Sequence, residues 1–390
     1  MKKIYMNNAA TTWPKPRETA EAVYSFMLED GANAARGSSS ARDLKSLDIL
    51  LTARMKAAKL FGGWEKANPK YVTLTMNITH SLNIVIKGFV KPGMRVVTSS
   101  MEHNSVVRPL RELQSEGVEL EIIQCSLRGY LSPRSLEEAI TTKKTDLVVI
   151  SHCSNVCGSV QPLAEVAECC ARHGVPLVVD CAQTAGLLPL TARELELSAL
   201  CFTGHKGLMG PQGTGGIVWK PEFAEAVSPF ITGGTGSRSH EETQPELMPD
   251  KFEAGTPNLP GIAGLDAAFD WLETTGIENI HAKEEKLGRL LEEKLKAIDG
   301  LRLLGSTGGE APRLPVYAFN IDGIDNGELA FALSDRWGIE SRPGLHCSPL
   351  AHRTLGTFPQ GALRLSPGYF TTEEEIEMTA QAIKEASDRK

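Results

Sequence analysis

Seven short apolar runs separated by helical patterns lie between residues 71 and 220, and this alternation limits the folds open to the chain. Strands buried on both faces read as continuous apolar runs, so helices must cover both faces of the sheet that such strands form. We therefore predict an α/β domain with a mostly parallel seven-stranded sheet covered by helices. The runs are Tyr71–Met76, Arg95–Ser99, Glu119–Gln124, Asp146–Ser151, Pro176–Asp180, Ala199–Thr203 and Gly215–Lys220.

Helical patterns lie before and between these runs. Arg42–Leu60 repeats apolar residues along one face and stops at Gly62, and Leu163–His173 stops at Gly174. The repeated residues of the first pattern are Leu44, Leu47, Leu51, Met55 and Ala58.

After Gly261 the pattern changes to two long helices, short strands and two further helices, which predicts a smaller α+β domain. The expected division is a large domain of residues 16–260 and a small domain of residues 1–15 and 261–390. The loop Gly233–Glu246 is expected to be mobile. The later elements are expected at Ile262–Thr274, His281–Ile298, Leu301–Leu304, Pro315–Ile321, Asn326–Trp337 and Thr372–Ser387.

Composition excludes several classes of protein. A net charge of −7 over 390 residues gives no support to a nucleic-acid or anionic-membrane surface. No apolar signal-peptide core follows Met1, and no run approaches the ~18–20 apolar residues of a membrane span. The expected compartment is the cytoplasm. Eight cysteines in such a chain suggest reduced thiols, and all except Cys347 lie in or beside apolar patterns. The group Cys153, Cys157 and His152 lacks zinc spacing, so no metal site is predicted.

Polar side chains follow the predicted strands where each strand ends. In open α/β sheets ligands bind beyond the carboxyl ends of the strands, so these side chains are expected to share one edge. Each alone has a plausible structural role, but their common placement favours a binding site. They are Thr79, His80, His103, Asn155, Asp180, Gln183, Thr203, His205 and Lys206.

Lys206 follows a buried strand and precedes a glycine-rich turn. Burial depresses the pKa of a lysine and makes its amine a usable nucleophile, although spacing alone allows a surface lysine equally well. Pyridoxal phosphate needs a lysine for a Schiff base and a carboxylate for its ring nitrogen, and Lys206 and Asp180 fit these two roles.

The other strand-end residues fit the rest of that cofactor. A helix N-terminus and hydroxyls would hold its phosphate, which suits Thr79 with its neighbour His80, and Thr203 with His205. His103 would stack on the ring, while Asn155 and Gln183 would bond the phenolic oxygen. A dinucleotide or nucleoside triphosphate site has little support, because neither a Gly-x-Gly-x-x-Gly sequence after the first strand nor a P-loop is present.

Nearly end to end, the chain resembles the cysteine desulfurases (the NifS, IscS and SufS family) of the class V aminotransferases, which have the fold of type I pyridoxal-phosphate transferases. One departure is Asn77-Ile-Thr-His80, where the family has Gly-Thr-Thr-Glu, so only Thr79 matches there. The matching segments are Asn7-Asn-Ala-Ala-Thr-Thr12, Met101-Glu-His103, Ser154-Asn-Val-Cys-Gly158, Asp180-Cys-Ala-Gln183, Thr203-Gly-His-Lys206, Phe252-Glu-Ala-Gly-Thr-Pro257, Arg342-Pro-Gly-Leu-His-Cys347 and Arg364-Leu-Ser-Pro-Gly-Tyr369.

The resemblance implies a homodimer with shared sites, in which Thr256 reaches the cofactor phosphate of the neighbouring subunit. It also places Arg36 near the partner's site. The short loop before Cys347 resembles the SufS-like group, and a dedicated sulfur-acceptor protein is expected because a short loop limits the reach of this cysteine.

Cys347 lies in a loop outside any core pattern, where Arg342 and His346 would provide an electropositive setting. An incidental loop cysteine is the alternative, but in the desulfurases the matching cysteine takes the sulfur as a persulfide. Arg364, on an apolar run, is suited to bind a carboxylate with two parallel hydrogen bonds.

The sequence thus predicts a pyridoxal-phosphate enzyme that converts L-cysteine to L-alanine and transfers the sulfur to Cys347. Selenocysteine lyase is the nearest alternative, followed by a class V aminotransferase or epimerase in which Cys347 is idle. A non-catalytic sulfur-carrier scaffold is disfavoured, since it has no need of Lys206, Asp180 and His103. The acceptor pathway stays open between iron–sulfur cluster assembly, tRNA thiolation and cofactor sulfuration.

Overall fold

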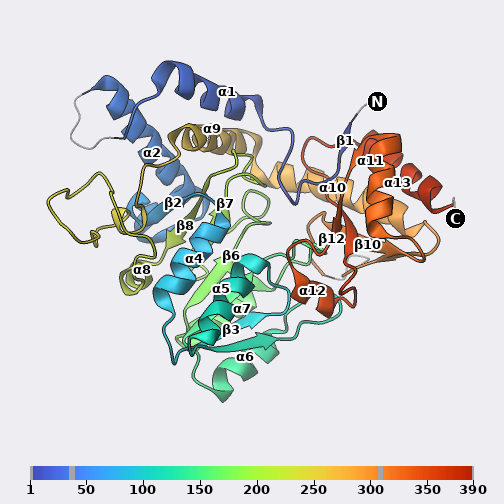
Figure 1. Cartoon of the computed structure of the whole chain (residues 1–390), viewed down its shortest axis with the longest axis horizontal. Coiled ribbons are helices and arrows are strands. Elements are labelled where there is room, and N and C mark those ends of the chain that lie inside the picture. The colour runs from blue at the N-terminus through green and yellow to red at the C-terminus, as the bar shows by residue number, and fades with distance from the viewer. Residues whose placement is uncertain (1–2, 35–39, 306–310, 389–390) are drawn as a thin grey trace.

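The computed structural model describes residues 3–34, 40–305 and 311–388. Figure 1 shows a larger body of mixed strands and helices, and a smaller one that holds both ends of the chain. None of the helices in the described ranges combines the length and apolar character needed to span a bilayer.

The larger body is built on a seven-stranded sheet with the strand order β2-β8-β7-β6-β5-β3-β4. All strand pairs are parallel except those of β8 with β2 and with β7, so the sheet is mostly parallel, as predicted. The seven strands are β2 (Val72–Thr75), β3 (Arg95–Ser99), β4 (Glu119–Ile123), β5 (Leu147–Ser151), β6 (Leu177–Asp180), β7 (Ala199–Thr203) and β8 (Gly215–Trp219).

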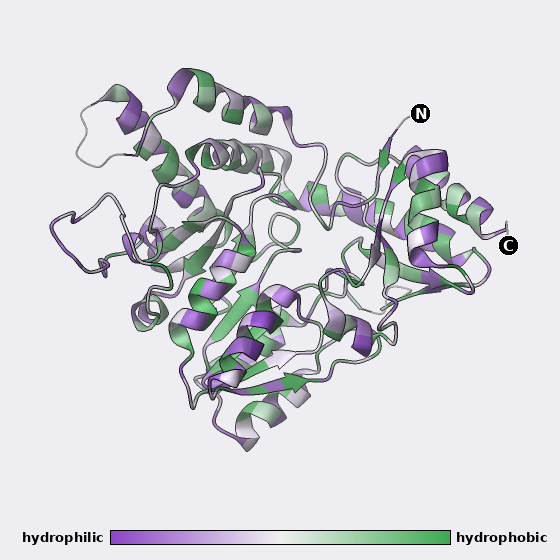
Figure 2. Ribbon diagram, viewed as in Figure 1, coloured by the Kyte–Doolittle hydropathy of each residue, from purple (hydrophilic) through white to green (hydrophobic). Residues whose placement is uncertain are grey.

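The central strands of this sheet are buried along their whole length, as expected where helices cover both faces. Figure 2 shows hydrophobic central strands and a mixture of polar and apolar residues on the covering helices. The helices of this body are α1 (Arg17–Ser25), α2 (Ala41–Leu60), α3 (Trp64–Ala67), α4 (Ile78–Phe89), α5 (Asn104–Ser115), α6 (Pro133–Thr142), α7 (Leu163–Arg172), α8 (Pro221–Ala226) and α9 (Leu259–Thr275), with short π and 3-10 turns η1 (Phe26–Asp30), η2 (Pro69–Tyr71) and η3 (Asp250–Phe252).

The smaller body contains a four-stranded sheet of order β12-β13-β10-β9, and β1 at the N-terminal end pairs with β11. Long helix α10 runs from the larger body into it (Figure 1). Its elements are β1 (Ile4–Tyr5), α10 (Ile277–Lys296), β9 (Leu301–Leu303), β10 (Tyr317–Ile321), α11 (Asn326–Trp337), β11 (Ile339–Glu340), β12 (Arg342–Gly344), α12 (Pro349–Thr354), β13 (Ala362–Leu365) and α13 (Glu373–Ser387).

The division into residues 16–260, and 1–15 with 261–390, stays a prediction. Helix α9 packs against α1 and α2 of the larger body, which favours placing the second boundary at Gly276, between α9 and α10. The segment Gly233–Glu246 lies in a long irregular connection between α8 and η3.

The apolar stripe expected along α2 is buried only in part. Ala58 is fully buried, while Leu44, Leu51 and Met55 are each about half exposed. The side chains that pack on α9 are Leu50 and Ala53, which share one apolar cluster with Leu259, Ile262 and Ala263.

Candidate active site

Two neighbouring parallel strands place Asp180 and Lys206 at the same edge of the sheet. Asp180 is the last residue of β6, and Lys206 follows β7 after a tight turn. The turn requires glycine at position 204, since a Cβ there would lie 2.1 Å from the Thr214 hydroxyl oxygen. This local geometry directs the chain back over the carboxyl ends of the strands.

The amine of Lys206 is prepared to act as a nucleophile. Burial lowers its pKa to about 8, opposed by the carboxylate of Asp180 and assisted by the guanidinium groups of Arg364 and Arg342. A substantial fraction of the amine is therefore neutral near physiological pH, as covalent attachment of a carbonyl compound requires.

Asp180 is a buried carboxyl group whose pKa is raised by burial. A 2.8 Å hydrogen bond from the Ala182 backbone N–H and the positive charge of Lys206 oppose that rise and favour the ionised form. An ionised carboxylate here is suited to pair with a protonated ring nitrogen.

His103 caps helix α5 and is a neutral imidazole. Its Nδ1 accepts a 3.1 Å hydrogen bond from the Ser105 backbone N–H, so its proton sits on Nε2. Burial, followed by the charge of Lys206, lowers its pKa to about 4. A neutral imidazole in this position can stack on an aromatic cofactor, because it carries no positive charge that would attract the cofactor's phosphate instead.

The side chains predicted to bind the phosphate include polar atoms that have no hydrogen-bond partner within the described parts of this chain. The buried Nδ1 of His205 and the buried Nε2 of His80 have no hydrogen-bond partner, and the Thr203 hydroxyl makes only a 3.4 Å contact with the Thr214 carbonyl. Thr79 is exposed in the first turn of α4, where backbone N–H groups favour anions. Together with Asp180 and Lys206, these residues fit a cofactor with a cationic ring and a phosphate.

Thr256 and Lys206 line different cavities. Thr256 is exposed, and with His80 and Gly213 it lines a cavity of about 530 Å³. Among the described residues that line this cavity, neither Asp180 nor Lys206 occurs.

Arg364 on β13 is almost fully buried and is held in place by neutral groups. Its Nη1 donates to the Asn155 carbonyl at 2.8 Å and its Nη2 to Asn7 Oδ1 at 3.0 Å, while its Nε has no partner. Burial and the nearby Arg342 lower its pKa to about 9, and no carboxylate in the described ranges pairs with it. A buried cation without a counter-charge is costly, so this guanidinium is suited to receive an anionic ligand.

Cys347, between β12 and α12, is exposed, and the other seven cysteines are buried, as predicted. Its Sγ lies 3.7 Å from Arg342 Nη2, and its carbonyl accepts a 2.8 Å hydrogen bond from the Asn104 N–H, directly after His103. The expectation that His346 adds positive charge is wrong, because burial lowers its pKa to about 2. Arg342 alone provides the electropositive setting within this loop.

The two amide side chains proposed to bond the phenolic oxygen are engaged elsewhere in this structure. Gln183 Nε2 donates to the Ala9 carbonyl, and Asn155 bonds the His346 carbonyl and the Ser348 hydroxyl. Their cofactor roles stay predictions. Arg36 lies outside the described residues.

Sequence analysis did not identify Lys15, whose side chain hydrogen-bonds the backbone of the turn that carries Lys206. Lys15 Nζ donates to the His205 carbonyl at 2.7 Å and to the Thr12 hydroxyl, which in turn donates to the Lys206 carbonyl at 3.0 Å. Thr12 belongs to a segment that carried the family resemblance, but nothing in the spacing pointed to Lys15.

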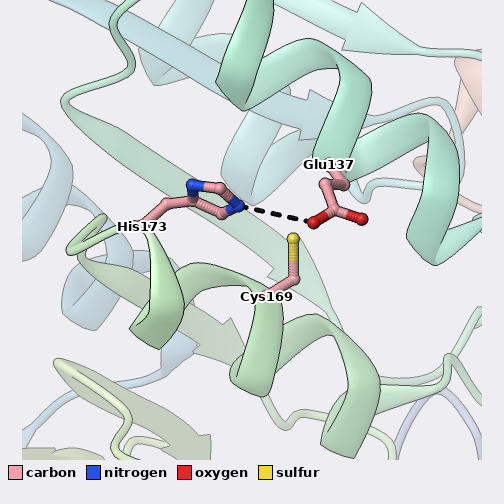
Figure 3. A group of neighbouring side chains, drawn as sticks. All are labelled: Glu137, Cys169 and His173. Carbon is pink, nitrogen blue, oxygen red and sulfur yellow. Dashed lines mark hydrogen bonds and ion pairs between the residues drawn. The ribbon is translucent and has the colours of Figure 1, made fainter.

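A second cluster of ligand-type side chains lies on α6 and α7 (Figure 3). The ligand atoms of Glu137, Cys169 and His173 are within 4.8 Å of one another. Glu137 Oε1 already pairs with Arg172 at 3.2 Å as well as with His173 at 3.5 Å, so a guanidinium supplies the positive charge that a metal ion would bring.

Comparison with known proteins agrees with this geometry. The family model described as aminotransferase class V matches residues 4–378. A probable cysteine desulfurase of a Synechocystis species is 31% identical over 98% of this chain and 90% of its own length. One from Methanothermobacter thermautotrophicus is 31% identical over 98% of this chain and 94% of its own.

Solved structures give the same result. The apo structure of a cysteine desulfurase from Thermococcus onnurineus superposes with a TM-score of 0.91, at 29% identity, covering 99% of this chain and 95% of that one. A cysteine desulfurase from Escherichia coli superposes with a TM-score of 0.87 at 28% identity, again over 99% of this chain and 95% of the other. The chain therefore belongs to the class V aminotransferase family and, within it, to the cysteine desulfurases.

Proposed function

We propose that this chain is a pyridoxal-phosphate enzyme that removes the sulfur of L-cysteine. One molecule of L-cysteine and the Cys347 thiol give L-alanine and a Cys347 persulfide, so atoms and electrons balance without another reactant. The observation that carries this proposal is the exposed Cys347, 3.7 Å from Arg342 and bonded through its backbone to the residue after His103.

The cofactor would be held by residues of the larger body. Lys206 binds it covalently, Asp180 pairs with its ring nitrogen and His103 stacks on its ring. Its phosphate is held by Thr79, His80, Thr203 and His205, with Thr256 from a second subunit. When bound, pyridoxal phosphate withdraws electrons from the amino acid attached to it.

The remaining steps belong to side chains of this chain. Arg364 binds the substrate carboxylate and fixes the amino acid, with Asn155 and Arg342 beside it and Arg36 reaching in from the partner. The amine of Lys206 moves protons at the substrate Cα. Cys347, with the Arg342 guanidinium beside its sulfur, attacks the substrate sulfur as a thiolate.

The direct test is to purify the protein with pyridoxal phosphate and to measure alanine and sulfide released from L-cysteine, with and without a reductant. We expect one alanine per sulfur, and sulfide release that depends on the reductant because the sulfur first stays on Cys347. Turnover of selenocysteine alone would replace the proposal with selenocysteine lyase. Release of products without sulfur would favour an aminotransferase or epimerase.

Arg364 is expected to decide substrate affinity. Arg364→Lys keeps the charge but loses the paired hydrogen bonds, and a charge-assisted hydrogen bond contributes about 1.5–3 kcal/mol, so kcat/KM for L-cysteine should fall about 10- to 100-fold. Steady-state kinetics measure this, and the absorbance of the bound cofactor serves as the control for folding. An unchanged KM and kcat in Arg364→Lys would remove the arginine from the binding site.

A homodimer and a dedicated sulfur acceptor complete the proposal. Large apolar side chains remain exposed on α1, η1 and α2, which supports a subunit interface there. The connection that carries Cys347 is only four residues long between β12 and α12, which supports an acceptor that comes to the enzyme. The exposed side chains are Tyr24, Met27, Leu28, Leu44, Leu51 and Met55.

A further inference from the structure

The loop that carries Cys347 has an unfavourable backbone conformation. His346 and Cys347 both have positive φ angles, 51° and 58°, in the left-handed region that favours glycine. Each such residue is less stable there than in the right-handed region, because its Cβ crowds the following carbonyl oxygen. Two in succession persist only where surrounding contacts hold them.

One set of contacts holds the loop backbone from the larger body. The Asn155 amide donates to the His346 carbonyl at 2.7 Å and accepts from the Ser348 hydroxyl at 2.7 Å, so it spans Cys347 on both sides. The Asn104 N–H donates to the carbonyl of Cys347 itself at 2.8 Å.

A second set is a chain of two imidazoles whose proton positions are fixed. His346 Nε2 must donate to the Arg342 carbonyl at 2.9 Å, because a carbonyl oxygen only accepts. Its Nδ1 therefore accepts from His352 Nε2 at 3.1 Å. His352 Nδ1 in turn accepts from the Thr357 hydroxyl at 2.7 Å.

Both rings are neutral, as this arrangement requires. His352 is completely buried and His346 nearly so. Burial, followed by the charge of Arg364, lowers the pKa of His352 to about 4, and burial likewise lowers that of His346. Thr357 then donates to His352, His352 donates to His346, and His346 donates to the backbone carbonyl of Arg342.

The chain of hydrogen bonds ends at the residue whose side chain contacts the nucleophile. Arg342 accepts from His346 through its carbonyl, and its guanidinium lies 3.7 Å from Cys347 Sγ. Within the described ranges, His352 on α12 forms its side-chain hydrogen bonds with His346 and Thr357 and none with Cys347, so its effect on the thiol passes through His346 and Arg342.

We propose that His352 is a positioning residue for Cys347. By donating from Nε2 it selects the tautomer of His346 that bonds the Arg342 carbonyl, and so it keeps the left-handed turn closed and the Arg342 guanidinium beside the thiol. The inference rests on the proposed function for its turnover readout, but its readout of thiol reactivity does not depend on turnover.

The test compares His352→Leu, which removes the donor, with His352→Gln, whose Nε2 can replace it. In His352→Leu we expect kcat for sulfur release to fall about 10-fold or more, since loss of precise placement lowers the rate of the chemical step. The visible band of the lysine-bound cofactor should persist. His352→Gln should recover most of the lost rate.

Thiol reactivity is the second readout. The rate of iodoacetamide alkylation of Cys347 is measured at one fixed pH, in a protein whose other cysteines are buried. The cations near this thiol are Arg342, Arg364 and Lys206. Because reactive thiols need an electropositive setting, withdrawal of Arg342 should lower the alkylation rate in His352→Leu, and His352→Gln should restore it.

Several outcomes would overturn the proposal. Wild-type kcat and an unchanged alkylation rate in folded His352→Leu would show that the imidazole is a packing element only, and so would equal losses in the Leu and Gln variants. If His352→Leu fails to fold, Thr357→Val removes the hydroxyl donor at the other end of the hydrogen-bond chain, and it should lower the alkylation rate in the same way but by less. An unchanged rate in Thr357→Val counts against the proposal. If the wild type releases no alanine from L-cysteine, the proposed function fails while the alkylation result still decides the role of His352.

Discussion

Replacing Cys347 by serine is expected to abolish sulfur release while leaving the cofactor bound. Serine keeps the size of the side chain and its loop contacts, which run through the backbone carbonyl. It removes the thiolate, and loss of a covalent nucleophile costs about 10³-fold or more in kcat. Alanine and sulfide assays measure the loss, and the absorbance band of the lysine-bound cofactor should match the wild type.

The matched control is Cys170→Ser, a buried cysteine on α7. Seven of the eight cysteines are buried, so a loss confined to Cys347→Ser separates its chemistry from a general need for thiols. Undiminished sulfur release in Cys347→Ser would show that the thiol is idle and that sulfur leaves the substrate without forming a persulfide on Cys347.

The seven strands could be predicted from the sequence almost to the residue, because all but the edge strand β4 are largely buried and are flanked by turn-forming residues. The predictions for β3 (Arg95–Ser99) and β7 (Ala199–Thr203) agree with the structure at both ends. Helix α2 is the exception in its orientation, since periodicity finds a helix but cannot tell whether an apolar stripe meets the core or another surface.

The grouping of Asp180, His103 and Lys206 could also be predicted, because parallel strands deliver their carboxyl ends to one edge of the sheet. The support of Cys347 could not. Asn155 lies 191 residues from His346, and their hydrogen bond depends on how the two bodies pack. The role of His352 could not be predicted either, since nothing in the sequence distinguishes a histidine on a short helix from any other polar residue there.

Replacing Lys206 by alanine is expected to have the other large effect. The variant should lose both the visible band of the lysine-bound cofactor and essentially all turnover, by about 10³-fold or more, because the amine is both anchor and proton carrier. Spectroscopy and the alanine assay measure the two losses. The pair of variants then separates two functions: Lys206→Ala loses band and activity together, whereas Cys347→Ser loses activity alone.

The pH dependence of cofactor attachment tests why Lys206 is reactive. Only the neutral amine attacks a carbonyl, and the pKa of Lys206 is lowered from 10.5 to about 8, so the attachment rate in cofactor-free protein should rise about tenfold per pH unit below 8 and level off above it. Borohydride trapping followed by peptide mapping measures this rate. Mapping is needed because burial also lowers the pKa of Lys15, to about 7, and Lys206→Ala isolates any reaction there. A rate that keeps rising to pH 10 would mean that burial does not prepare this lysine, since an ordinary lysine titrates there.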